Sequence, residues 1–135
     1  MFDGLILLGQ GVAHFMTPAG LFNVAWATLL GVVIGILPGL TATMGVALLV
    51  TLTYKMAPDQ AILTLMCVYL GAIYGGSRTA ILLNIPGTPA NAAATLDGHP
   101  LAQQGRAGLA MGLATTSSTL GTLVGVFFLA IIAPF

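Results

Sequence analysis

The sequence predicts an all-α fold, a polytopic membrane helical bundle whose helices are broken at Pro-Gly motifs. Of its 135 residues, 58% are hydrophobic and only 4% are charged, and the mean hydropathy is +1.06. Soluble domains carry about 25% charged residues, so this chain cannot build a water-facing surface. Its apolar runs reach the length of membrane helices, and Pro38-Gly39 and Pro86-Gly87 interrupt them. We expect residues 1–135 to form a single membrane domain.

Composition also excludes several functions. Three basic and three acidic residues give zero formal net charge, which predicts no nucleic-acid partner. The lone Cys67 cannot form an internal disulfide. Metal-ligand clusters and nucleophile–base pairs are absent from the sequence pattern, so we expect no enzyme, no metal site and no resident cofactor.

The first half of the chain contains three apolar segments. Residues 2–15 predict a short amphipathic or partly inserted helix that stops at Thr17-Pro18. Residues 21–37 and 40–54 are each near the lower limit of the roughly 17–25 residues that a full crossing needs. They form either two short spans or one re-entrant hairpin that enters and leaves on the same side.

The second half begins with a polar loop at 55–59, with Pro58 suited to the first turn of the next helix. We expect that helix to run over 60–74 and to break at Gly75-Gly76, with the chain breaking again at Pro86-Gly87. Residues 88–100 show no helical stripe. Pro100 suits the first position of a helix that opens at 101–105, and 107–133 predicts the last long span.

Four glycine pairs have the four-residue spacing that lets membrane helices approach closely. The pairs are Gly31/Gly35, Gly71/Gly75, Gly108/Gly112 and Gly121/Gly125. We interpret them as helix-packing surfaces.

The two breaks are the candidate functional site. Unwound backbone at membrane depth persists only where protein buries it or where it lines a wet cavity, and transporters use it to bind substrates and ions. Hydroxyls, carboxamides and freed carbonyls suit sodium or a carboxylate, and in membranes they also cap and pack helices. The candidate residues for substrate or cation binding are Pro38, Gly39, Thr41, Thr43, Ser77, Arg78, Thr79, Asn84, Pro86, Gly87, Thr88, Asn91, Thr95 and Asp97.

Several of these residues leave alternatives open. A guanidinium in an apolar run costs at least about 2.5 kcal/mol, so Arg78 either grips a carboxylate substrate, pairs with Asp97, or lies at the interface with its head in water. Asp97 is either a helix N-cap or a cation ligand or proton carrier, and His99 is either a loop residue or a titrating group. Thr41 and Thr43 either cap free amides or face the same cavity as the second break.

At these motifs the chain resembles the large membrane subunit of the tripartite tricarboxylate transporter family. The resemblance rests on residues 31–40, 74–87, 95–100 and 105–108, and it runs over nearly the whole chain. Where the family has an aromatic residue after Asp-Gly, this chain has His99. Family members are longer and have a second half that resembles the first, so the chain is expected to be the N-terminal part of a two-repeat permease.

The resemblance implies a multi-pass permease of the bacterial inner membrane that takes up tricarboxylates or dicarboxylates. A sodium or proton gradient would drive it, with Na+ a possible coupling ion. Its partners would be a small membrane subunit and a periplasmic solute-binding protein. The alternative hypothesis is a membrane scaffold that does not transport and only packs with a larger permease.

Overall fold

The computed structural model describes residues 3–132, and all regular secondary structure within that range is helical. This confirms the all-α membrane bundle that the sequence predicts. The start of the first helix at Phe2 and the end of the last span at Ala133 lie outside the described residues. The elements are α1 (Asp3–Phe15), α2 (Pro18–Ile36), α3 (Ala42–Thr53), α4 (Pro58–Leu83), η1 (Pro89–Asn91), α5 (Ala92–Leu101), η2 (Ala102–Arg106) and α6 (Ala107–Ile132).

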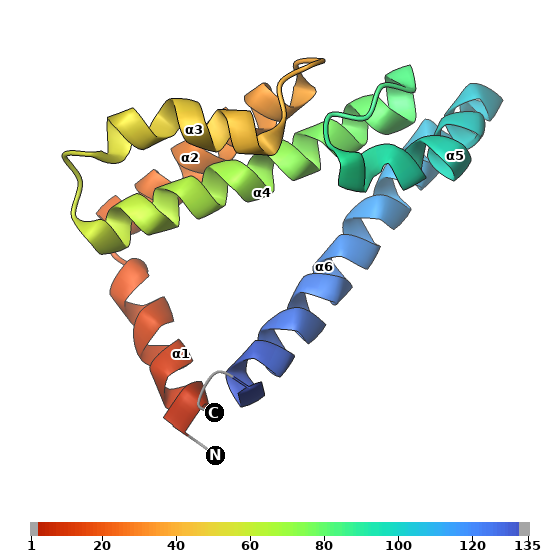
Figure 1. Ribbon diagram of the computed structural model, residues 1–135. Coiled ribbons are helices and arrows are strands. Elements are labelled where there is room, and N and C mark those ends of the chain that lie inside the picture. The colour runs from red at the N-terminus through yellow and green to blue at the C-terminus, as the bar shows by residue number, and fades with distance from the viewer. Residues whose placement is uncertain (1–2, 133–135) are drawn as a thin grey trace.

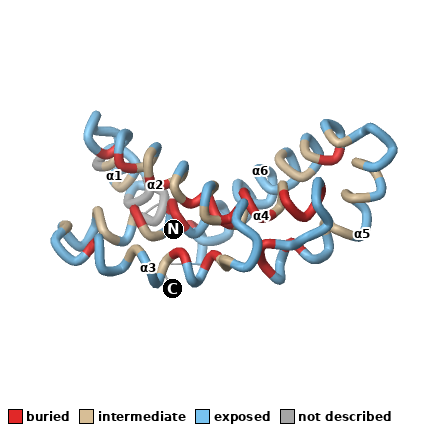
Figure 2. The backbone as a smooth tube through the Cα atoms, turned by 90° about the horizontal axis from the view of Figure 1, so that it is seen from above, coloured by how far each residue is buried: buried red, intermediate tan, exposed pale blue. Residues whose placement is uncertain are grey.

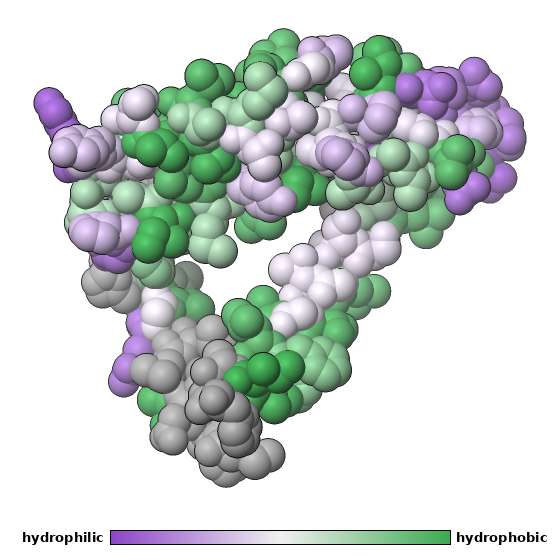
Figure 3. Space-filling model, viewed as in Figure 1, coloured by the Kyte–Doolittle hydropathy of each residue, from purple (hydrophilic) through white to green (hydrophobic). Residues whose placement is uncertain are grey.

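Three helical stretches are long and apolar enough to cross a membrane: α2, α4 and the stretch Pro89–Ile132 that contains α5 and α6. The 26 residues of α4 span about 39 Å, more than the roughly 30 Å of the hydrocarbon core. The 12 residues of α3 reach only about 18 Å. Hydrophobic side chains cover much of the visible outer surface, and hydrophilic ones gather at the α3–α4 loop and at the α5–α6 end (Figure 3).

Five of the helices form two differently packed regions: α2, α3 and α4 make one, and α1 and α6 make the other. Helices α2, α3 and α4 lie together in one layer, with α3 antiparallel to the other two (Figure 1). Helices α1 and α6 extend from the two ends of this layer and converge. Buried residues concentrate on α2 and α4, whereas only Ala110 and Ala130 are buried on α6 (Figure 2).

Helices α2 and α4 run parallel and touch through reciprocal glycines. A Cβ atom on Gly31 would fall on the Val68 carbonyl oxygen, and one on Gly71 would fall on the Thr28 carbonyl oxygen. Gly35 meets Ala72, and Gly75 meets Val32, in the same way one turn further along. Only glycine allows two helix backbones to come this close. The packing role predicted for these two glycine pairs is therefore confirmed.

The expected break at Gly75-Gly76 is wrong, because α4 continues through both glycines to Leu83. Intact backbone hydrogen bonding along the helix outweighs the roughly 1 kcal/mol per glycine that helix propensity would predict. The two glycines are buried and serve contact instead, Gly75 with α2 and Gly76 with the segment that follows α4.

Helix α2 begins at Pro18, with the Thr17 side chain as its N-cap, and the first break forms at its other end, where the sequence predicts it. The helix ends at Ile36, immediately before Leu37-Pro38, because proline cannot supply the next backbone donor. Gly39 then adopts a positive φ of 92°, which reverses the chain toward α3.

Residues 88–100 differ from expectation. They are mostly helical, because η1 and α5 begin at Pro89 and Ala92. Pro100 lies inside α5 rather than at the start of a helix. The chain changes direction further along, at Gly105, whose φ is 78°. The weak apolar stripe that obscured α5 in the sequence reflects a short helix with no buried residue.

Candidate functional site

The second break packs against α2 and α4 at a three-glycine contact. A Cβ atom on Gly87 would lie 2.8 Å from the Cα of Gly76 and 2.9 Å from the Gly35 carbonyl oxygen. Gly87 belongs to the second break, Gly76 to the C-terminal third of α4, and Gly35 to the last turn of α2 just before Pro38. The unwound chain after α4 therefore folds back onto the end of α2.

Asn91 fastens this folded-back segment to α4. Its Nδ2 donates to the Ile73 carbonyl oxygen at 3.0 Å, and the side chain is only 7% exposed. The same Nδ2 lies 2.8 Å from the point that a Cβ on Gly76 would occupy. Gly76 thus leaves room for both Gly87 and Asn91. We designate Gly35, Gly76, Gly87, Thr88 and Asn91 as the break junction.

Thr88 is the chemically distinctive residue of the break junction. It is 8% exposed, and its Oγ1 is the one buried side-chain polar atom without a hydrogen-bond partner in the described part of the chain. Its backbone carbonyl accepts from the Asn91 amide at 3.0 Å, which fixes the residue at the start of η1. An unpaired buried hydroxyl costs about 1–3 kcal/mol, so it calls for a partner.

The end of α4 contributes Thr79 and Asn84. The Thr79 hydroxyl donates to the Gly76 carbonyl oxygen at 3.0 Å, inside the helix. Asn84 ends the helix in the left-handed region at φ 58°, and its backbone N–H donates to the Thr79 carbonyl oxygen. Asn84 and Pro86 are exposed, whereas Gly87 and Thr88 are buried. Asn84 is therefore accessible at the break, and its left-handed backbone shapes the turn there.

Arg78 and Ser77 belong to a different face of α4. The Arg78 guanidinium donates to the Met111 carbonyl oxygen at 3.1 Å and to Thr115 Oγ1 at 2.6 Å, both on α6. It also stacks over the Tyr74 ring at 4.1 Å. Ser77 donates to the Tyr74 carbonyl oxygen within its own helix. Arg78 thus links α4 to α6 instead of pairing with Asp97.

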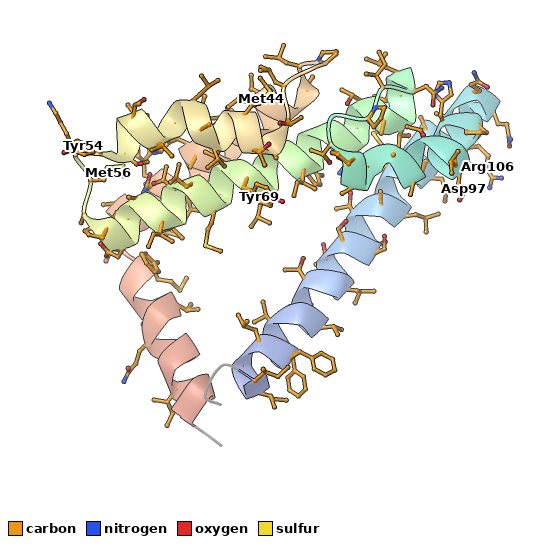
Figure 4. All side chains as sticks on the ribbon, viewed as in Figure 1. Met44, Tyr54, Met56, Tyr69, Asp97 and Arg106 are labelled. Carbon is orange, nitrogen blue, oxygen red and sulfur yellow. The ribbon has the colours of Figure 1, made fainter. Side chains whose placement is uncertain are left out.

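Residues on α5 are not drawn into the break junction. Asp97 is exposed and lies in the interior of α5, so it is not the N-cap that the sequence suggested. Arg106 lies at the same α5–α6 end of the molecule (Figure 4). Thr95 donates to the Ala92 carbonyl oxygen of its own helix. His99, by contrast, bonds through Nδ1 to the Ile81 carbonyl oxygen at 3.1 Å and so ties α5 to the end of α4.

Residues of the first break after α2 serve α3. Thr41 is the N-cap of α3, and its Oγ1 accepts from the Met44 amide at 3.3 Å. Thr41 and Thr43 share a hydroxyl hydrogen bond of 2.9 Å. Pro38 and Gly39 are exposed. Thr41 therefore takes the capping role, and Thr43 bonds to the Thr41 hydroxyl.

A polar network that the sequence interpretation missed lies between α2 and α4, at the end away from the breaks. Asn23 Nδ2 donates to Thr64 Oγ1 at 2.9 Å and to Gln60 Oε1 at 3.2 Å. Trp26 Nε1 donates to Asn23 Oδ1 at 2.8 Å. Asn23 is 7% exposed and Thr64 1%. The sequence signal for this network was Asn23, a carboxamide isolated in an apolar run. Its partners Gln60 and Thr64 lie one turn apart on the other helix.

Metal-binding clusters are absent from the described residues: no three His, Cys, Asp or Glu side chains within 3–132 are placed to hold an ion.

Comparison with known proteins supports a transport role. The family model described as "Tripartite tricarboxylate transporter TctA family" matches residues 21–135. A curated relative from Agrobacterium vitis, described as an uncharacterized 52.8 kDa protein in the TAR-I ttuC' 3' region, is 38% identical over 137 residues. That alignment covers 99% of this chain and 27% of the relative, so the chain spans about a quarter of the relative's length. No solved structure matches.

Proposed function

The chain belongs to the tripartite tricarboxylate transporter TctA family, and from that premise we propose that it forms part of a permease for the uptake of carboxylates. The proposed permease lies in the bacterial inner membrane and is driven by a sodium or proton gradient. A small membrane subunit and a periplasmic binding protein that delivers the carboxylate are its proposed partners. It carries out translocation without covalent chemistry.

The observation that carries this proposal is the break junction. Two helices that merely span the membrane would have no reason to stop at Pro38 and Pro86 and then bury the second unwound segment against the last turn of α2. Broken helices whose ends converge supply backbone dipoles and small polar groups to a solute at membrane depth. The unpaired Thr88 hydroxyl is a group of this kind.

Arg78 supplies the positive charge that a carboxylate requires. Two of its five N–H donors bind Met111 and Thr115, so donors remain for an anion. The Tyr74 ring and the α6 oxygens hold the planar guanidinium in place. A guanidinium with no acidic partner in the described chain attracts an anion more strongly than a neutralised ion pair does.

The test is uptake of radiolabelled citrate by the full-length permease, reconstituted with its small subunit and binding protein. Arg78→Lys keeps the charge and loses the fork, so we expect the KM to rise about tenfold or more. The matched control is Arg106→Lys, which changes an exposed arginine at the α5–α6 end and should leave the KM unchanged.

Two further variants separate transport from folding. Asn84→Ala and Pro86→Ala alter the break while leaving its buried contacts in place, and we expect each to lower uptake more than it lowers the amount of folded protein in the membrane. Unchanged uptake by Arg78→Lys together with parallel loss of uptake and folded protein in the break variants would reject the proposed site. A complex that takes up no carboxylate would indicate the scaffold function.

A further inference from the structure

We propose that Thr115 on α6 is a positioning residue for carboxylate binding, because it holds the Arg78 guanidinium with one edge turned toward the solute. This inference rests on the proposed function and deepens it. The sequence does not single out Thr115, since residues 115–119 are all serine or threonine. Only the fold shows which of these hydroxyls meets the arginine.

Helix α6 presents a pair of oxygens to Arg78. The Thr115 hydroxyl donates to the Met111 carbonyl oxygen at 2.7 Å, so the two oxygens lie side by side. A threonine that donates in this way to the carbonyl four residues earlier keeps its lone pairs as acceptors. Arg78 Nη1 donates to the Met111 oxygen at 3.1 Å, and Nη2 donates to Thr115 Oγ1 at 2.6 Å. Two neighbouring oxygens that bind different terminal nitrogens occupy the edge that Nη1 and Nη2 share.

The opposite edge of the guanidinium remains open to an anion. The Tyr74 ring covers one face of the planar group at 4.1 Å, and the α6 oxygens cover its terminal edge. Within residues 3–132, no acceptor binds Nε, and Arg78 is only half-buried. Nε–H and the outer N–H of a terminal nitrogen form the second fork by which an arginine holds a carboxylate through two parallel bonds.

Thr115 supplies the part of this arrangement that a side chain can provide. Arginine has high rotamer freedom, and binding a carboxylate is weaker when that freedom is lost only at the moment of binding. The bond to Thr115 is the shorter of the two α6 contacts, whereas the Met111 acceptor belongs to the backbone. Removing the Thr115 hydroxyl therefore leaves the charge in place but frees the fork to move.

The neighbouring hydroxyls provide a matched control. Thr119 lies one turn further along α6, and its hydroxyl donates to the Thr115 backbone carbonyl at 2.8 Å. Thr116 and Ser117 also donate to backbone carbonyls of α6. Within the described part of the chain, Arg78 bonds to none of these three side chains. Thr119→Val thus removes a hydroxyl from the same helix without touching the arginine.

The experiment measures thermal unfolding of the purified full-length permease in detergent as citrate is added. Na+ and ionic strength are kept constant with choline chloride. A ligand that binds only the folded state raises the unfolding midpoint as its concentration passes the Kd. In Thr115→Val we expect the same rise to require about fivefold more citrate or more, because the fork is no longer held. Thr115→Ser and Thr119→Val should need the same citrate concentration as the unmodified protein.

A second measurement separates positioning from a structural role. A contact that only joins α4 to α6 would lower the midpoint without citrate and leave the citrate dependence unchanged. If Thr115 acts through Arg78, Thr115→Val should add no further loss of citrate binding in the Arg78→Lys background. Should Thr115→Val fail to fold, Thr115→Ala takes its place, again read against Thr115→Ser.

Four outcomes would overturn the proposal. A lower citrate requirement in Thr115→Val would show that α6 competes with the carboxylate for Arg78. An unchanged requirement, or an undiminished further loss in the Arg78→Lys background, would remove the positioning role, and the proposed function would stand if Arg78→Lys alone weakens citrate binding. No citrate shift in the unmodified permease would also reject the role, and citrate uptake by the reconstituted complex would then decide the proposed function separately.

Discussion

Helices α2 and α6 carry the same glycine spacing but use it differently. Gly31 and Gly35 of α2 lie against the backbone of α4, where any side chain would collide with carbonyl oxygens. Gly112 and Gly121 of α6 have no atom within 4 Å of the position where a Cβ would be. The spacing therefore permits close approach without causing it.

The difference comes from the partner helix. Helix α4 supplies its own pair, Gly71 and Gly75, at the height that matches α2, and the Asn23–Thr64 hydrogen bonds fix the register. Helix α6 meets α4 mainly at its first turns, where Arg78 binds Met111 and Thr115. In lipid, where apolar surfaces gain little by leaving an apolar solvent, matched small residues and interhelical hydrogen bonds decide which helices associate.

The largest effect should come from filling the glycine contact. Gly31→Leu places a side chain on the Val68 carbonyl, so we expect a loss of about 3 kcal/mol in the free energy of unfolding. The measurement is equilibrium unfolding of the purified protein in a detergent mixture. The matched control, Gly112→Leu, has open space and should change stability far less. Equal losses in both variants would contradict the distinction between the two helices.

A smaller effect is expected at the polar anchor. Asn23→Leu removes the interhelical partner of Thr64 and Gln60 and the acceptor of Trp26 on the same helix, so we expect about 1–2 kcal/mol of destabilisation in the same assay. Thr122→Val is the control, because that hydroxyl donates only to the Ser118 carbonyl of α6 itself. A neutral Asn23→Leu would show that the glycines alone hold the pair.

The smallest effect concerns the turn that separates the two regions. Gly105 has a positive φ of 78°, so Gly105→Ala should cost about 1 kcal/mol in unfolding free energy. Gly108→Ala, three residues later in regular helix with open space around it, should instead gain up to about 1 kcal/mol. Opposite signs for the two substitutions are expected, and a stabilising Gly105→Ala would contradict the turn geometry.

The sequence predicts features that depend on local chemistry. Proline and glycine fix the ends of α2 and α4, and composition fixes the membrane environment. Features that depend on tertiary contact are harder to predict. Gly75-Gly76 resembles a helix break in the sequence, because the sequence does not show that these glycines contact α2 and Gly87. The packing role of Asn23 depends on its hydrogen bonds to Gln60 and Thr64, which lie about forty positions later in the sequence.

Prediction of the candidate site follows the same division. The sequence correctly singles out Pro38 and Pro86 as breaks, and the structure brings Gly87 of the second break against Gly35 in the last turn of α2. That Pro38 and Pro86 form one substrate site stays a prediction. The sequence cannot predict that the Thr88 hydroxyl is buried without a partner while the Thr95 hydroxyl bonds within its own helix, since both are threonines in a polar stretch. The binding roles of the candidate residues remain predictions.

The parallel packing of α2 on α4, which places the end of α2 beside the second break, can be tested directly by disulfide formation. The Cys67 thiol lies beside the Thr28 side chain, so oxidation of Thr28→Cys in native membranes should join the two helices. After trypsin cleaves at the exposed Lys55, the fragments should stay linked until a reductant is added. Leu29→Cys, 65% exposed on α2, should not cross-link. Separation of the fragments in the oxidised Thr28→Cys variant, or equal linkage in Leu29→Cys, would contradict the packing that creates the break junction.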